Sequence, residues 1–206
     1  MDHLSLLTDV DLIIVDLGGV LYDIDFERTR KAMMALDGYN GRPVEFSADV
    51  QNDLFLRVDR GELVVDDFLA ELRKTWGFTC SDDDLIDAWN AVLKEPFPWA
   101  VDVIRAMRTY AKVVLLSNIS WLHLWVARPQ CRDLFSEFDR LYFSCSTGLR
   151  KPDPEAFIQI LRDMNVAAAR TILYDDSIAN CKVATGLGLH VVRVKNPAEE
   201  FKGLLD

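Results

Sequence analysis

The sequence predicts an α/β fold in which a parallel β-sheet is flanked by helices and an all-helical block follows the first strand. Three observations support this prediction. Five short apolar runs have the composition of buried strands, helical patterns precede the last four of them, and a long stretch after the first run contains only helical patterns. Alternation of strands and helices is typical of a parallel sheet that is covered on both faces.

The predicted strands are rich in β-branched and other apolar residues, and they cover residues 11–16, 112–117, 140–144, 171–175 and 190–194. Helical patterns before the second to fifth strands cover residues 98–110, 120–135, 154–164 and 178–188. Because crossover connections are right-handed, we expect the carboxyl ends of these strands to lie at one edge of the sheet.

The stretch from residue 22 to residue 94 breaks this alternation. It has helical patterns but no convincing strand, and the helical patterns cover residues 26–36, 47–58, 65–76 and 83–93. A stretch of this length is too long for one crossover connection. We therefore expect a helical cap of residues 22–94 inserted into a core of residues 1–21 and 95–206.

The composition limits the partners and the compartment. The chain of 206 residues has a formal net charge of −10, which argues against nucleic acid or an anionic membrane, since both require a basic face. Its four cysteines form no CxxC pair, so reduced thiols are expected instead of a zinc site. We see no signal peptide and no apolar run of membrane-spanning length, and we expect a cytoplasmic protein. The sequence carries no signal for an oligomeric state.

Polar residues stand at or just beyond the ends of the first four predicted strands. In chain order they are Asp16, then Ser117 and Asn118, then Lys151 in a loop, then Asp175 and Asp176 with Asn180 one helical turn later. Each alone is weak evidence, because a strand-terminal aspartate is commonly a helix cap. Their expected meeting at one sheet edge, where ligands of such sheets bind, predicts a functional site.

These residue types suit the hydrolysis of a phosphate ester. Asp16 could attack phosphorus and form an aspartyl-phosphate. The repulsion between this carboxylate and the phosphate requires nearby cations. Lys151 would supply one positive charge, and Mg²⁺ held by Asp16, Asp175 and Asp176 would supply the other.

Four segments resemble the motifs of a known family. VDLGGVL, LLSN, GLRKPDPEAF and YDDSIANCKVATGLGL occur in this order. Together they resemble the haloacid dehalogenase superfamily of phosphohydrolases, whose Rossmann-like core and inserted cap match the organisation expected here over essentially the whole chain. DLGGVLYDIDF, RKPDPEAF, DDSIAN and, in the cap, DRGELVVDDF resemble one branch, the alpha-D-glucose-1-phosphate phosphatase group.

The resemblance implies roles in metal binding. Asp16 would be the nucleophile and a magnesium ligand. The main-chain carbonyl of Gly18 would be a second ligand, and Asp175 and Asp176 would anchor the ion directly or through water.

The resemblance also implies a phosphate site and a reaction. Ser117 and the backbone N–H of Asn118 would bind the phosphoryl group, Lys151 would neutralise charge, and Asn180 would support the metal-binding loop. The implied protein is a magnesium-dependent phosphatase acting on a small phosphorylated metabolite, with a sugar phosphate such as glucose 1-phosphate favoured.

Gly18 departs from the common pattern. Many members carry a second Asp there, which protonates the leaving group and activates water, and such catalysis contributes about 10²–10⁴-fold. Three hypotheses stay open. In the first, members of the branch with glycine hydrolyse phosphate esters without this aspartate. In the second, Asp23 or Asp25 supplies the proton. In the third, the protein is a catalytically weak relative that binds a phosphorylated ligand or a protein partner. Asp25 is also a candidate N-cap of a helix beginning near Phe26.

A 2-haloacid dehalogenase is a further alternative within the superfamily, because it also lacks a carboxylate at this position. The adjacent acids Asp175 and Asp176 argue against it. They would repel a substrate carboxylate unless a cation neutralised them.

Substrate choice is expected in the cap, which would close over the site and exclude water. Arg57, Arg60 and Glu62 are the candidates for contacting a sugar or a second anionic group, with exposed ion pairs as the alternative. Residues 121–126 could line the pocket entrance or a dimer face. His123 among them is expected to be a neutral surface or packed histidine and not a catalyst.

Overall fold

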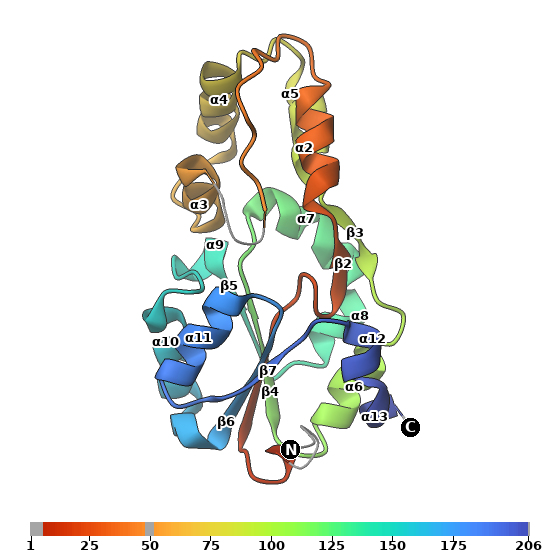
Figure 1. Ribbon diagram of the computed structural model, residues 1–206, viewed down its shortest axis with the longest axis vertical. Helices are drawn as coiled ribbons and strands as arrows, with labels where there is room; N and C mark the ends of the chain where they lie inside the picture. Colours follow the sequence, from red (N-terminus) through yellow and green to blue (C-terminus); the bar gives the residue numbers. More distant parts are fainter. Residues whose placement is uncertain (1–5, 48–51, 206) are drawn as a thin grey trace.

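The computed structural model describes residues 6–47 and 52–205. A sheet covered by helices forms the lower part of the molecule in Figure 1. The upper part consists of helices α2 (Phe26–Met34), α3 (Asp53–Asp59), α4 (Val65–Trp76) and α5 (Asp82–Asn90). We call these two parts the core and the cap. None of the described helices is both long and apolar enough to cross a membrane.

The core sheet has five parallel strands in the order β5-β4-β1-β6-β7. They are β1 (Leu12–Val15), β4 (Lys112–Ser117), β5 (Arg140–Phe143), β6 (Thr171–Asp175) and β7 (His190–Arg193). The five predicted strands are confirmed, each to within one residue at its ends. Val15 of β1 pairs with Leu115 on one side and Tyr174 on the other, so the chain leaves these three strands at the same edge.

Successive side chains of β1 point to opposite faces of the sheet, as the pleat requires. Ile13 and Val15 face one hydrophobic cluster, and Leu12 and Ile14 face the other. The first cluster is covered by α6 (Ala100–Met107), α7 (Trp121–Gln130), α8 (Arg132–Ser136) and α13 (Lys202–Leu205), and by Phe201, which follows α12 (Pro197–Glu200). The second is covered by α10 (Pro154–Met164) and α11 (Ile178–Gly186), while α9 (Ser144–Thr147) follows β5 and the 3-10 turn η1 (Ala168–Arg170) precedes β6.

The predicted helix over residues 120–135 is two helices, α7 and α8, that meet at Cys131. Pro129 lies in the last turn of α7 and lacks the N–H that would continue the hydrogen-bond ladder. By contrast, α10 has the predicted bounds.

The cap has its own hydrophobic centre, which includes the fully buried rings of Phe55, Phe68, Trp76 and Trp89. Leu122 of α7 joins this cluster, so the cap packs on the core. Helix α4 has the predicted bounds, and Ser81 caps α5 through a reciprocal capping box with Asp84. The pattern predicted over residues 47–58 corresponds to α3, although residues 48–51 lie outside the described part.

Two short strands connect the core with the cap, so the prediction that residues 22–94 contain no strand is wrong. Strand β2 (Tyr22–Ile24) pairs antiparallel with β3 (Leu93–Pro96) where the chain leaves and re-enters the core. Strands this short carry too little alternation to be recognised.

Candidate active site

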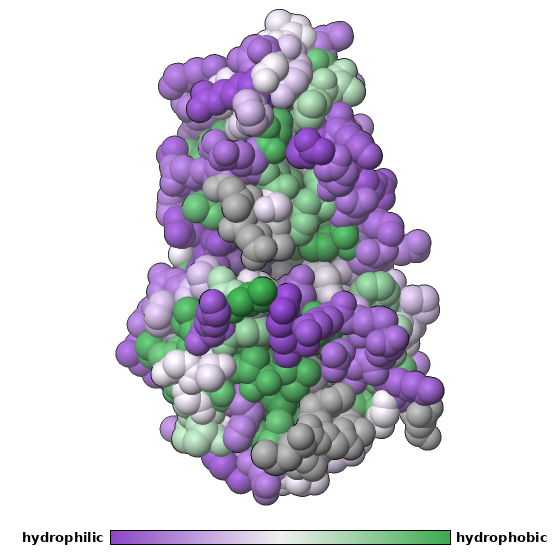
Figure 2. Space-filling view, in the orientation of Figure 1, coloured by the Kyte–Doolittle hydropathy of each residue, from purple (hydrophilic) through white to green (hydrophobic). Residues whose placement is uncertain are grey.

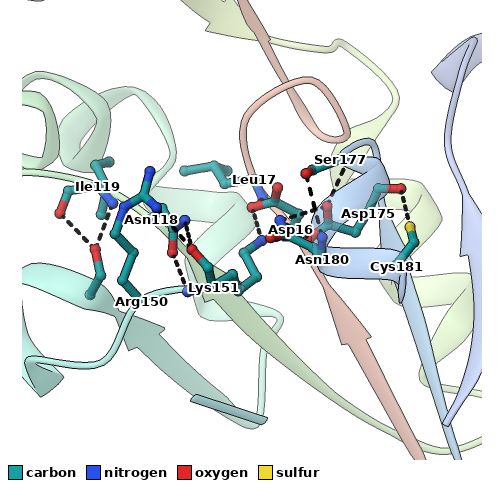
Figure 3. A network of polar contacts seen from close by, with 11 residues as sticks. Asp16, Leu17, Asn118, Ile119, Arg150, Lys151, Asp175, Ser177, Asn180 and Cys181 are labelled. Carbon is teal, nitrogen blue, oxygen red and sulfur yellow. Dashed lines mark hydrogen bonds and ion pairs between the residues drawn. The ribbon is translucent and has the colours of Figure 1, made fainter. Parts of the chain in front are cut away.

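The predicted strand-end residues meet at one buried cation. The ammonium Nζ of Lys151 lies 2.8 Å from Asp16 Oδ1 and 2.7 Å from Asp175 Oδ2. Asp16 follows β1, Asp175 ends β6, and Lys151 follows α9, so three separate segments supply the group (Figure 3). The side chains of Lys151 and Asp175 are almost completely buried, and Asp16 is only slightly more exposed.

The charges of this group depend on one another. Burial alone would lower the pKa of Lys151, but Asp16 and Asp175 hold it above its ordinary value, so the ammonium stays charged. Burial raises the pKa of Asp16 to about 7. The charge of Lys151 opposes this rise, whereas the charges of Asp175 and Asp176 add to it. An additional cation beside Asp16 would favour its ionised, nucleophilic form.

Side-chain amides hold the cluster in place. Asn118 clamps the backbone of Lys151, because its Oδ1 accepts a hydrogen bond from the Lys151 N–H (2.9 Å) and its Nδ2 donates to the Lys151 carbonyl (2.8 Å). Asn180 Nδ2 donates to both carboxylate oxygens of Asp175, at 2.9 and 3.1 Å. The Ser177 N–H also donates to Asp175, which fixes this carboxylate from three directions together with Lys151.

Three carboxylates can hold a metal ion. One oxygen each of Asp16, Asp175 and Asp176 lies within 4.8 Å of the others. Oxygen ligands are those that Mg²⁺ prefers, and the three carboxylates exceed the charge of the single Lys151 ammonium. The residues therefore fit a hard divalent cation. A contribution of the Gly18 carbonyl stays a prediction.

The glycine pair after Asp16 brings the backbone close to this cluster. Gly19 has a φ of 75°, and a β-carbon there would lie 2.6 Å from Asp176 Oδ2, so only glycine fits. Gly18 has no such backbone requirement. Instead, the side chain of Ile24 from β2 occupies the space beside it, with Cδ1 at 3.1 Å from the position of a β-carbon.

A cavity of about 440 Å³ lies between the cluster and the cap. Its core side is lined by the predicted residues Asp16, Gly18, Ser117, Asn118, Lys151, Asp176 and Asn180. Ser117, at the end of β4, is buried and lines the cavity beside Asn118. A hydroxyl in this position can donate to a phosphoryl oxygen.

Sequence reasoning missed an ion pair that joins cap and core at this cavity. Asp59 of α3 lies 3.4 Å from Nε of Arg150, and both side chains line the cavity with little exposure. Burial raises the pKa of Asp59 to about 6 against the opposing charge of Arg150. The burial of Asp59 could have been predicted from the sequence, because Asp59 follows Phe55 and Val58 at helical spacing on the apolar side of α3.

His123 also lines the cavity as a packed, neutral side chain. Its ring stacks on Trp89 with centroids 4.7 Å apart, and Nε2 donates to the Trp89 carbonyl at 3.1 Å. Burial lowers the pKa of His123 to about 4. Trp121 and Trp125 of the same helix are exposed and do not line the described cavity.

The other predicted residues lie elsewhere. Arg57 and Arg60 stand 3.8 and 3.9 Å from Glu62 in half-exposed ion pairs outside the described cavity wall. Their role in substrate choice stays a prediction. Asp23 pairs with Lys94 across β2 and β3, and Asp25 caps α2 by accepting the Glu27 N–H at 2.9 Å. Neither of these two carboxylates lines the cavity that the described residues form, which leaves no geometric support for either as a proton donor.

Comparison with known proteins finds phosphatases of similar sequence. The chain is 28% identical over 192 residues to a D-ribitol-5-phosphate phosphatase from Bacteroides thetaiotaomicron, covering 91% of this chain and 93% of that protein. It is 23% identical over 184 residues to a sesquiterpene phosphatase from Aspergillus oryzae, with 85% of each covered.

A solved structure supports the same assignment. A haloacid dehalogenase family enzyme from Bacteroides thetaiotaomicron, crystallised with magnesium and inorganic phosphate, superposes with a TM-score of 0.77 at 30% identity, covering 90% of this chain and 94% of that one. Residues 10–188 match the haloacid dehalogenase-like hydrolase family. The protein therefore belongs to the haloacid dehalogenase-like hydrolases.

Proposed function

We propose that the protein is a magnesium-dependent phosphatase that hydrolyses a small phosphate monoester through an aspartyl-phosphate on Asp16. The observation that carries this proposal is the buried Lys151 ammonium between Asp16 and Asp175, beside a cluster of three carboxylates. This arrangement supports the proposal, because phosphoryl transfer requires a nucleophile beside fixed positive charge and a bound cation.

The residues divide the reaction into two steps. An oxygen of Asp16 forms a bond to phosphorus while the ester oxygen leaves with its electron pair and takes up a proton. Water then attacks the phosphorus, releases inorganic phosphate and restores the Asp16 carboxylate. Lys151 and the Ser117 hydroxyl would bind the phosphoryl oxygens in both steps. Magnesium bound by Asp16, Asp175 and Asp176 would supply further positive charge against the phosphate.

The relatives support the phosphate chemistry but differ in the alcohol. One is named for ribitol 5-phosphate and another for a sesquiterpene. Because both names denote phosphatases, the shared part of the substrate is the phosphate group. These names do not test the sugar phosphate, such as glucose 1-phosphate, that the sequence resemblance favours. They also do not test the cytoplasmic location.

Two alternatives are less well supported. A 2-haloacid dehalogenase would place a substrate carboxylate near Asp175 and Asp176, which repel it. A catalytically weak protein would bind phosphorylated ligands without turnover. The three-carboxylate cluster beside Lys151 has no evident use in such a protein.

The test is hydrolysis of p-nitrophenyl phosphate by the purified protein, with magnesium and with EDTA. We expect turnover well above the uncatalysed rate with magnesium, and its loss with EDTA. Binding of inorganic phosphate without turnover would favour the weak relative. Release of halide from 2-chloropropionate in the presence of EDTA would instead favour the dehalogenase.

A further inference from the structure

The cap side of the cavity is apolar. The cap and its connecting strands contribute eight of the described lining residues, and six of these are Ile24, Phe26, Phe46, Leu56, Val92 and Leu93. The space-filling view shows hydrophobic surface between the two parts of the molecule, bordered by hydrophilic side chains (Figure 2). A substrate whose phosphate meets Lys151 on the core side would therefore place its alcohol part against carbon.

The other two cap-side residues are polar, but both already have protein partners. The Tyr22 hydroxyl contacts the side chain of Gln130 and lies 3.1 Å from the Lys94 carbonyl. Asp59 is paired with Arg150. On the core side, Nε2 of His123 is occupied by the Trp89 carbonyl. A polyol held against the cap would lose water from several hydroxyls and find few replacement partners on the cap side of the described wall.

The apolar wall is also well packed. Phe46 contacts Phe26 edge-to-face with ring centroids 5.0 Å apart, and it lies 4.8 Å from the Trp89 ring. The phenylalanine side chains carry no hydrogen-bonding group, so this part of the wall offers a ligand hydroxyl no partner. Buried hydroxyls without partners disfavour binding, whereas apolar groups gain from leaving water.

We propose that this cavity selects phosphate monoesters with an apolar body, such as an alkyl or isoprenyl chain, over polyol and sugar phosphates. The proposal rests on the proposed phosphatase function and names the substrate class of the same site. The cavity volume of about 440 Å³ lies within the range of small-molecule sites, so an apolar body can enter together with the phosphate.

A matched pair of substrates tests this selection. Pentyl phosphate and ribitol 5-phosphate share chain length and a primary ester oxygen, and they differ only in their hydroxyls. We expect kcat/KM for pentyl phosphate to be at least about tenfold higher, because hydroxyls without partners oppose binding. Lengthening the alkyl chain is expected to raise kcat/KM by about two- to fourfold for each methylene until the cavity is full.

A matched pair of variants assigns the effect to the cavity wall. Leu56 and Leu63 are both partly buried cap leucines, but only Leu56 lines the cavity, whereas Leu63 packs on the cap core. Leu56→Gln is expected to lower kcat/KM for pentyl phosphate by about tenfold while leaving that for ribitol 5-phosphate unchanged or raised. Leu63→Gln is expected to keep the wild-type ratio.

The outcomes separate this proposal from the proposed function. If p-nitrophenyl phosphate is not hydrolysed with magnesium, the phosphatase assignment itself fails. If it is hydrolysed, but ribitol 5-phosphate or glucose 1-phosphate equals or exceeds pentyl phosphate in kcat/KM, the phosphatase assignment stands and the apolar selection is overturned. An identical substrate ratio in Leu56→Gln and wild type would also overturn it.

Discussion

The side chain of Ile24 fills the space beside Gly18, with its Cδ1 atom 3.1 Å from the position that a β-carbon on residue 18 would take. Many superfamily members carry a catalytic aspartate at this position. In this protein the connecting strand β2 brings an isoleucine there, so the glycine and the isoleucine form one packing unit. A side chain at position 18 would therefore compete for space with Ile24 of β2, the strand that leads into the cap.

This packing predicts a coupling between the two positions. Gly18→Ala is expected to lower the free energy of unfolding by about 1–3 kcal/mol, because the added methyl group must displace Ile24. Ile24→Val removes Cδ1, so the double variant Gly18→Ala/Ile24→Val should be more stable than the sum of the single changes by about 1 kcal/mol. Urea unfolding of wild type, the two single variants and the double variant measures this coupling. Additive effects would show that Ile24 does not limit the space at position 18.

Lys151 is expected to be required for both activity and stability. Lys151→Met leaves Asp16 and Asp175 buried without their cation, which should lower stability by about 3–5 kcal/mol. Loss of its charge at the phosphoryl group should lower kcat by about 10²–10³-fold. Lys182→Met, an exposed lysine on α11, serves as the control in thermal unfolding and aryl phosphate hydrolysis. Equal melting temperatures and equal hydrolysis rates in the two variants would show that Lys151 contributes to neither stability nor catalysis.

Magnesium is expected to stabilise the folded protein. At about 100 times its dissociation constant, a ligand that binds only the folded state adds about 2.7 kcal/mol. The melting temperature should therefore rise with magnesium. The rise should shrink in Asp176→Asn and persist in Glu199→Gln, which changes an exposed acid away from the cluster. A rise of the same size in Asp176→Asn would contradict the assigned ligand.

The buried Asp59 predicts a pH-dependent stability. Its pKa is raised from 3.8 to about 6 on folding, so the folded state keeps a proton that the unfolded state releases. This contribution is fully present below the unfolded pKa and is lost as the pH rises through about 6. A shift of about two pKa units corresponds to about 3 kcal/mol. Relative to Asp59→Asn, the wild type should lose about that much stability between about pH 4 and about pH 7.

The measurement is urea unfolding of both proteins across this pH range. Arg150 and Arg60 are the cations that act on Asp59, and both are present in wild type and variant, so the difference isolates the carboxyl group. Asp67→Asn, at an exposed position of α4, keeps Asp59, so its stability difference from wild type should not change with pH. A stability difference between wild type and Asp59→Asn that does not change with pH would mean that folding leaves the pKa of Asp59 at its ordinary value of 3.8.

The sequence predicted the parts of this protein whose signals are local. The core strands were recognisable because they are buried on both faces and therefore continuously apolar, as in residues 112–117. Helices α4 and α10 kept their predicted bounds because their apolar periodicity is clear and each meets a strong boundary signal. Gly77 ends α4, and Asp153 with Pro154 begins α10.

The features that were missed depend on distant residues. Asp59 becomes a buried cavity residue only because Arg150, 91 residues later, lies opposite it. The filling of the space at Gly18 by Ile24 depends on the turn into β2, and β2 itself is recognisable only through its pairing with β3. None of these relationships leaves a periodic pattern in one stretch of sequence.

The central claim is that Asp16 is the nucleophile, and acid quenching during turnover of p-nitrophenyl phosphate with magnesium tests it most directly. Mass spectrometry of the quenched protein should find a phosphate adduct on the peptide that contains Asp16. The adduct and the turnover should both be absent in Asp16→Asn, with its thermal unfolding recorded to show that it is folded. Turnover by Asp16→Asn near the wild-type rate, or an adduct on another residue, would contradict the account.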